Sequence, residues 1–217
     1  MKLKKIASLA LAGIMAVSML AGCNGSSSST PTEPETPATS NYAATLQDAL
    51  EGKARRIVTK AVANSELDSA LQSAVDTYYN DSQLWYAYDA NVTFLKNSND
   101  ETGKDINSAV VKALSAEDTI ENLDNDNDKD TVAVEVYAVS ASVSNTKALE
   151  LVADKITDTI SGHVNNGKFT EKSRDSEYDY SYDIAASIVT KNYSTVGDMS
   201  VGVKYIAIAV TQHVTRV

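Results

Sequence analysis

The clearest pattern of hydrophobic and polar positions lies in the second half of the chain. Residues 131–143 are hydrophobic at both alternating sets of positions, which predicts a central strand with both faces buried. Residues 178–188 and 201–209 carry apolar or aromatic side chains at every second position, which predicts two further strands. The link between them is short and contains Gly197, so we expect a C-terminal β-hairpin. Apolar residues at helical spacing predict a helix over 149–160.

The first half of the chain alternates helical and strand-like patterns. Apolar side chains three and four positions apart predict helices over 44–62, 65–78 and 106–114, and a short helical turn over 120–123. Residues 84–95 place hydrophobic and aromatic side chains at every second position, which predicts a strand. The expected order is therefore helix, helix, strand, helix, strand, helix, strand, strand. This order favours an α+β fold in which the helices pack on one antiparallel or mixed sheet.

Composition narrows the classes of function. The chain has 217 residues, a length that suits one or two domains, and a net charge of −10. We expect no nucleic-acid binding, because phosphate contacts need clustered lysine and arginine and the chain has no long basic run. The single cysteine excludes an intrachain disulfide framework and a cysteine-based zinc cluster.

The N-terminal segment has the layout of a secretory signal. Three lysines, at positions 2, 4 and 5, precede a run without charges from 6 to 22. Its most apolar part, residues 6–20, would span about 22 Å as a helix, which is less than the roughly 30 Å of a bilayer core. The run ends in Leu-Ala-Gly-Cys at positions 20–23, where the chain has its one cysteine.

This tetrapeptide resembles the lipobox of bacterial lipoproteins, in which small residues precede a cysteine that is lipidated and becomes the new N-terminus. The resemblance covers the first 23 residues and implies that residues 1–22 are a lipoprotein signal peptide. It also implies that Cys23 carries a diacylglycerol thioether and an amide-linked acyl chain, enough hydrocarbon for stable anchoring. The expected location is the extracytoplasmic face of the cell membrane, with an outer membrane as the alternative.

The remainder of the chain divides into a linker and a body. Residues 24–41 are rich in Ser, Thr, Pro and Glu and contain all three prolines, so we expect a stiffened linker without a core. The lipidated cysteine and linker thus occupy residues 23–41, and residues 42–217 suit a single α+β domain. Removal of residues 1–22 removes three lysines and no acid, so the exported body is more acidic than the whole chain.

An acidic run precedes the expected central strand. Oxygen-bearing side chains at alternate positions suit a hard cation such as calcium. The spacing resembles the calcium loop of EF-hands and dockerin-like modules, which implies a ligand set drawn from Asp124, Asp126, Asp128, Asp130 and Glu135. Lys129 replaces the glycine of that loop, and a strand follows where a helix should. The alternative is therefore a solvated acidic turn without a metal ion.

Aromatic side chains supply a second candidate site. They gather on two of the expected strands, with Trp85, Tyr86 and Tyr88 on one and Tyr178, Tyr180 and Tyr182 on the other. Flat aromatic faces stack on sugar rings and anchor partner proteins. The alternative is that these rings pack beneath helices, as strand tyrosines commonly do. A binding role requires the rings to be exposed together.

The chain lacks the local motifs of common enzymes. It has no G-x-S-x-G elbow, H-E-x-x-H helix or phosphate-binding glycine loop. We expect His163 near a helix end and His213 in the last strand, where neither needs a catalytic role. Paired carboxylates for glycoside hydrolysis stay open, because their separation depends on the fold.

These observations lead to one functional hypothesis and two alternatives. We expect a membrane-tethered extracytoplasmic lipoprotein whose body binds an envelope protein or a glycan without catalysing a reaction. The first alternative is a surface module stabilised by calcium. The second is an envelope hydrolase that uses dispersed carboxylates gathered in a pocket.

Overall fold

The computed structural model describes residues 39–123, 129–163, 168–171, 176–196 and 199–216. Within them the α-helices are α1 (Thr39–Ala49), α2 (Gly52–Ile57), α3 (Ser65–Tyr78), α4 (Glu101–Ala113) and α5 (Asn145–His163). Short 3-10 helices are η1 (Asp81–Tyr88), η2 (Leu95–Asn97) and η3 (Ile120–Asn122). The strands are β1 (Val58–Ala61), β2 (Thr93–Phe94), β3 (Thr131–Ser140), β4 (Lys168–Glu171), β5 (Ser176–Val196) and β6 (Met199–Arg216). The expected α+β class is confirmed.

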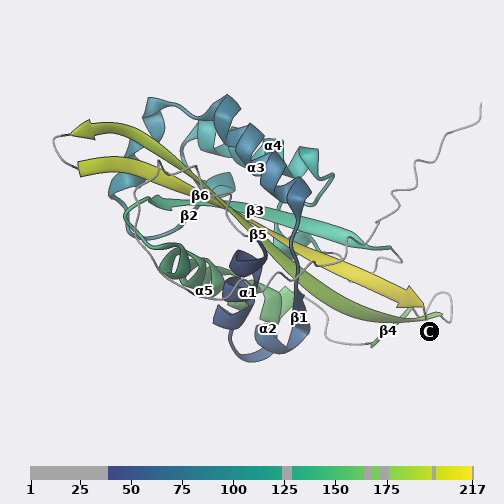
Figure 1. Ribbon diagram of the computed structural model, residues 1–217. Coiled ribbons are helices and arrows are strands. Elements are labelled where there is room, and N and C mark those ends of the chain that lie inside the picture. The colour runs from purple at the N-terminus through teal and green to yellow at the C-terminus, as the bar shows by residue number, and fades with distance from the viewer. Residues whose placement is uncertain (1–38, 124–128, 164–167, 172–175, 197–198, 217) are drawn as a thin grey trace, which may run out of the picture. The chain divides into compact units, whose positions relative to one another are not determined.

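The strands form one mixed sheet (Figure 1). Its order is β1-β5-β6-β3-β2, and β4 also pairs with β5. Strand β1 is parallel to β5, whereas the other pairs are antiparallel. Strands β5 and β6 pair along most of their length, from Tyr178 opposite Arg216 to Val196 opposite Met199. The C-terminal hairpin predicted from the alternating pattern is therefore confirmed.

Helices cover both faces of the sheet, as Figure 1 shows. Helices α1, α2 and α5 pack on one face, where their apolar side chains form a core with odd-numbered residues of β3 and even-numbered residues of β5 and β6. Helices α3 and α4, together with η1, pack on the other face and form a second core. The sheet is the middle layer, so its central strands are buried from both sides.

Strand β3 places the charged residue Glu135 on the face of the sheet that α5 covers. Its side chains alternate, so one set faces α5 and the other faces α4. Ala133, Tyr137 and Val139 belong to the core on the α5 side, and Val134, Val136 and Ala138 to the core on the α4 side. Glu135 occupies an odd position and therefore points toward α5. The predicted central strand is confirmed.

The helix predicted over residues 44–62 is divided in the structure. Helix α1 ends at Ala49, α2 runs from Gly52 to Ile57, and the chain then continues as β1. Gly52 has a φ of 55°, in the left-handed region that glycine adopts without steric cost. Helix α1 also begins at Thr39, inside the segment expected to be a linker.

The strand predicted over residues 84–95 is wrong for most of its length. Residues Asp81–Tyr88 form the 3-10 helix η1, and only Thr93–Phe94 belong to a strand. A 3-10 helix has three residues per turn, so positions three apart share a face. Gln83 and Tyr86 are buried on one face, and Trp85 and Tyr88 are exposed on another. The aromatic spacing that suggested a strand is therefore explained by the three-residue repeat of a 3-10 helix.

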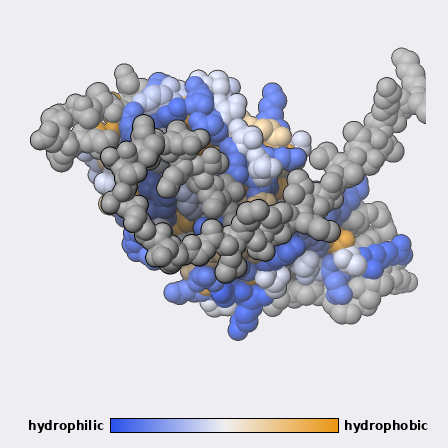
Figure 2. Space-filling view, in the orientation of Figure 1, coloured by the Kyte–Doolittle hydropathy of each residue, from blue (hydrophilic) through white to orange (hydrophobic). Residues whose placement is uncertain are grey.

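Figure 2 shows one side of the molecule by hydropathy. The described residues visible there are mainly hydrophilic, and the hydrophobic ones form small separate spots. This distribution agrees with the burial of most large apolar side chains in the two cores.

Candidate ligand pocket beside helix α5

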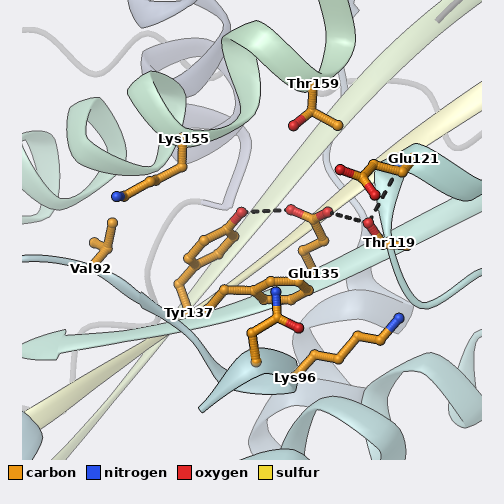
Figure 3. Close-up of a pocket in the computed structure, with 10 residues that line it drawn as sticks. Val92, Lys96, Thr119, Glu121, Glu135, Tyr137, Lys155 and Thr159 are labelled. Carbon is orange, nitrogen blue, oxygen red and sulfur yellow. Dashed lines mark hydrogen bonds between the residues drawn. The ribbon is translucent and has the colours of Figure 1, made fainter. Parts of the chain in front are cut away.

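A pocket of about 350 Å³ lies between helix α5 and the β3–β2 part of the sheet (Figure 3). It is lined by Val92, Phe94, Lys96, Asn97, Thr119, Glu121, Glu135, Tyr137, Lys155 and Thr159. Small-molecule sites in proteins have volumes of about 300–1,000 Å³. The pocket is therefore large enough for a small ligand.

The carboxylate of Glu135 lies at the floor of this pocket. Glu135 is 5% exposed, and within the described residues it has no cationic partner. Its Oε1 accepts hydrogen bonds from the Thr119 hydroxyl and the Ile120 backbone N–H, both at 3.0 Å. Its Oε2 accepts a hydrogen bond of 2.6 Å from the Tyr137 hydroxyl. Three neutral donors thus hold a buried negative charge in one orientation.

Helix η3 supplies two of these donors. Thr119 precedes the helix, and its hydroxyl accepts a hydrogen bond from the Glu121 N–H at 3.3 Å while it donates to Glu135. Thr119 therefore caps η3 and fixes the pocket floor at the same time. Glu121, the second residue of η3, also lines the pocket.

Tyr137 forms an aromatic wall next to the carboxylate. Its ring stacks on Phe94 of β2, with centroids 5.3 Å apart and an interplanar angle of 30°. Burial raises the pKa of the Tyr137 hydroxyl, and the negative charge of Glu135 raises it further. The phenol therefore keeps its proton at neutral pH and acts as a fixed donor.

The pocket edge carries charges of both signs. Lys96 forms an ion pair of 2.8 Å with Asp118, and this hydrogen bond lowers the pKa of Asp118. Lys155 of α5 is exposed, and so is Glu121 of η3. In the part of the chain that the structure describes, neither Lys155 nor Glu121 has an ion-pair partner. Figure 3 places these two on opposite sides of the hydrogen bond between Glu135 and Tyr137.

The proposed calcium ligands do not come together as one group of described side chains. Asp124, Asp126 and Asp128 lie outside the described residues. Asp130 accepts a hydrogen bond of 2.8 Å from the Val214 N–H and contacts His213 Nδ1 at 3.2 Å. Glu135 bonds to η3 and Tyr137 instead. Among the described residues, no cluster of three or more His, Cys, Asp or Glu side chains is suited to hold a metal ion.

The two histidines differ in what the structure describes. The side chain of His163, the last residue of α5, lies outside the described side chains. His213 of β6 is half-buried, and its Nε2 contacts Asp183 of β5 at 3.1 Å. The ring therefore joins two carboxylates at one end of the hairpin, and none of these three residues lines the pocket.

The six aromatic residues predicted as a binding surface do not share one surface. Tyr86, Tyr180 and Tyr182 are buried, and the side chain of Tyr178 lies outside the described side chains. Trp85 and Tyr88 are exposed at 46% and 75%. Because Tyr182 belongs to the core on the α5 side and Tyr86 to the core on the α4 side, the sheet separates the two groups.

Sequence reasoning missed most of the pocket. Glu135 was predicted as a metal ligand, and its neighbours Thr119, Glu121, Phe94, Lys155 and Thr159 were not predicted as site residues. One signal was present, since Glu135 is the only charged residue in the mainly apolar strand β3. Lys155 and Thr159 are four positions apart, which places them on one face of α5. Nothing in the sequence relates that helix face to Glu135.

Cys23 lies outside the described residues, as does the whole lipobox-like segment. Among the described helices, none is long and apolar enough to cross a membrane. Comparisons of this chain with protein-family models, with curated proteins and with solved structures give no match.

Proposed function

We propose that this chain is a membrane-tethered lipoprotein whose body binds a ligand of the cell envelope in the pocket beside Glu135. The anchor in this proposal is lipidated Cys23, on the extracytoplasmic face of the cell membrane or of an outer membrane. The Leu-Ala-Gly-Cys sequence at positions 20–23, behind a basic and then apolar segment, supports the anchor. The partner is an envelope protein segment or a glycan.

The buried carboxylate of Glu135 is the observation that carries the binding role. Burial of a charge costs free energy, and a buried glutamate in a protein is normally paired with a cation. Instead, two hydroxyls and a backbone N–H hold the carboxylate in place at a pocket floor. Rigid placement of a charged group by neighbouring donors is typical of a recognition site.

Tyr137 favours recognition over acid–base catalysis. Its raised pKa keeps the phenol protonated, and its hydroxyl is already bonded to Glu135. General acid–base catalysis needs a group that exchanges protons near the working pH. A donor that stays protonated instead holds its acceptor in position.

Cell fractionation tests the anchor. We expect the wild-type chain to be recovered in the membrane fraction and to incorporate labelled palmitate, whereas Cys23→Ser should lose the label and stay unprocessed or leave the membrane. Ser27→Ala, in the linker next to the anchor, is the matched control and should behave as wild type. Processed, membrane-bound Cys23→Ser protein would contradict the anchor.

A thermal-shift measurement tests the pocket. Two pools of soluble envelope fragments serve as probes, one of short peptides and one of glycan oligomers. We expect one pool to raise the melting temperature of the wild type but not of Thr159→Trp, whose larger side chain fills the pocket edge. Asp158→Trp, at an exposed neighbouring position of α5, is the control and should respond as wild type. An equal shift in Thr159→Trp, or no shift with either pool, would contradict binding at this pocket.

A further inference from the structure

The charge of Glu135 has no cation to balance it among the described residues, although the side chain is almost fully buried. We infer that the pocket binds a short peptide as a zwitterion, with its ammonium group against Glu135 and Glu121 and its terminal carboxylate against Lys155. This inference rests on the proposed binding role of the pocket and names its ligand class.

The hydrogen bonds of Glu135 indicate where the ammonium group of the peptide would bind. A carboxylate has about four positions at which it accepts hydrogen bonds. Oε1 accepts two bonds and Oε2 accepts one, so Oε2 retains an acceptor position in the pocket lining. Glu121 lies on the same side of the pocket and adds a second carboxylate. A ligand ammonium there would balance the buried charge and donate to both carboxylates.

Lys155 is the residue that would bind the terminal carboxylate of the peptide. The other lysine of the pocket, Lys96, is already paired with Asp118. Lys155 has no such partner within the described residues and lies across the pocket from Glu121 (Figure 3). The Asn97 side chain adds an amide to the lining. A ligand with opposite charges at its two ends therefore complements both sides of the pocket, whereas a neutral glycan complements neither.

The wall between these ends suits a short backbone with small side chains. Val92 and Phe94 give the lining an apolar part, and the hydroxyl of Thr159 is a polar group on the α5 side. An extended peptide advances about 3.3–3.6 Å per residue, so its two terminal charges separate as residues are added. A length series therefore locates the separation that matches Lys155 and Glu121.

Isothermal titration calorimetry on the full-length protein in detergent tests this inference. The probes are dialanine, trialanine and tetra-alanine with free ends, followed by the N-acetylated, the C-amidated and the doubly blocked form of the best binder. We expect one free peptide to bind, and each single block to weaken binding at least about tenfold, because each removes a charge-assisted contact.

Two charge variants assign each end of the peptide. Lys155→Gln should weaken the free peptide about tenfold but leave the affinity of the C-amidated form unchanged, since that form has no carboxylate to lose. Glu121→Gln should weaken the free peptide and leave the N-acetylated form unchanged. Lys147→Gln and Glu150→Gln, which alter an exposed ion pair of 3.1 Å elsewhere on α5, are the matched controls and should bind as wild type.

The outcomes separate this inference from the proposed function. Equal affinity for free and doubly blocked peptides would overturn the zwitterion and leave the pocket's binding role standing. The absence of binding heat with every free peptide would also overturn the zwitterion. A thermal shift with the glycan pool that Thr159→Trp abolishes would then still support the binding role of the pocket. The lipid anchor is tested independently, by cell fractionation of Cys23→Ser.

Discussion

Tyr137 donates a hydrogen bond of 2.6 Å to Glu135, two positions earlier on the same strand. Side chains two apart on a strand share a face, so this contact is a direct result of the pleat of β3. It keeps a carboxylate and a phenol together in a core that is mostly apolar. The contributions of Tyr137 and Glu135 to the free energy of unfolding should therefore be coupled.

A double-mutant cycle measures this dependence. Tyr137→Phe should lower the free energy of unfolding by about 1.5–3 kcal/mol, because it removes a hydrogen bond to a charged group. Glu135→Leu should cost a similar amount, since it leaves the donors of Tyr137 and Ile120 without an acceptor. The double variant should lose at least about 1 kcal/mol less than the two single losses combined, as measured by urea unfolding. Additive losses would show that the two residues act independently.

Alkaline pH should destabilise the protein through its buried tyrosines. Burial raises the pKa of Tyr86, Tyr137 and Tyr182 above the ordinary value of 10.0. Above that pH the unfolded chain loses protons that the native state retains, so this stability is complete below pH 10.0 and falls as the pH rises further. Urea unfolding across this range should show a shallower decline in Tyr137→Phe. An identical pH dependence in wild type and Tyr137→Phe would refute the role of Tyr137.

Lys204 should be replaceable with a gain in stability. The residue is 5% exposed on β6, its amino group donates to the Val143 carbonyl, and burial lowers its pKa below 10.5. Lys204→Met should raise the free energy of unfolding by about 1 kcal/mol at neutral pH, because it removes a buried charge that has no ion-pair partner in the described part of the chain. The gain should shrink as the pH rises toward 10.5, because the native lysine loses its proton at a lower pH than the unfolded one. Lys147→Met, at an exposed position, is the control and should change stability little.

Two glycines should respond to alanine in opposite directions. Gly52 has a φ of 55°, so Gly52→Ala should cost about 1–2 kcal/mol of stability through backbone strain. Gly162 lies inside α5 with open space where a Cβ would be. Gly162→Ala should therefore gain about 0.5–1 kcal/mol by favouring the helix. Thermal unfolding of both variants provides the comparison, and a stabilised Gly52→Ala would contradict the account of the break between α1 and α2.

The elements with a long, regular pattern could be predicted from the sequence. The hairpin of β5 and β6 follows from alternation sustained over many residues, and strand β3 follows from a run that is apolar at both sets of positions. The segment 84–95 could not, because a three-residue and a two-residue period coincide at several positions of so short a stretch. The break at Gly52 was also missed, since its apolar neighbours continue the helical spacing.

The pocket could be predicted only in part, because it is assembled from distant segments. Glu135 stands out as a lone charge in an apolar strand, but the sequence does not show that Thr119 and Tyr137 hold it. Lys155 belongs to a helix with many exposed charges, and none of them is distinguished by spacing. Its relation to Glu121 depends on how α5 lies on the sheet, which is decided by packing rather than by local propensity.

The parallel pairing of β1 with β5 has a consequence for how the chain folds. Val58 pairs with Tyr182, so β1 cannot join the sheet until β5 is in place. Until then, the apolar side of α1 and α2 has no sheet to cover and remains open to other hydrophobic surfaces. Such distant pairing has to close a long loop before it adds stability, so we expect it to slow the folding of the body.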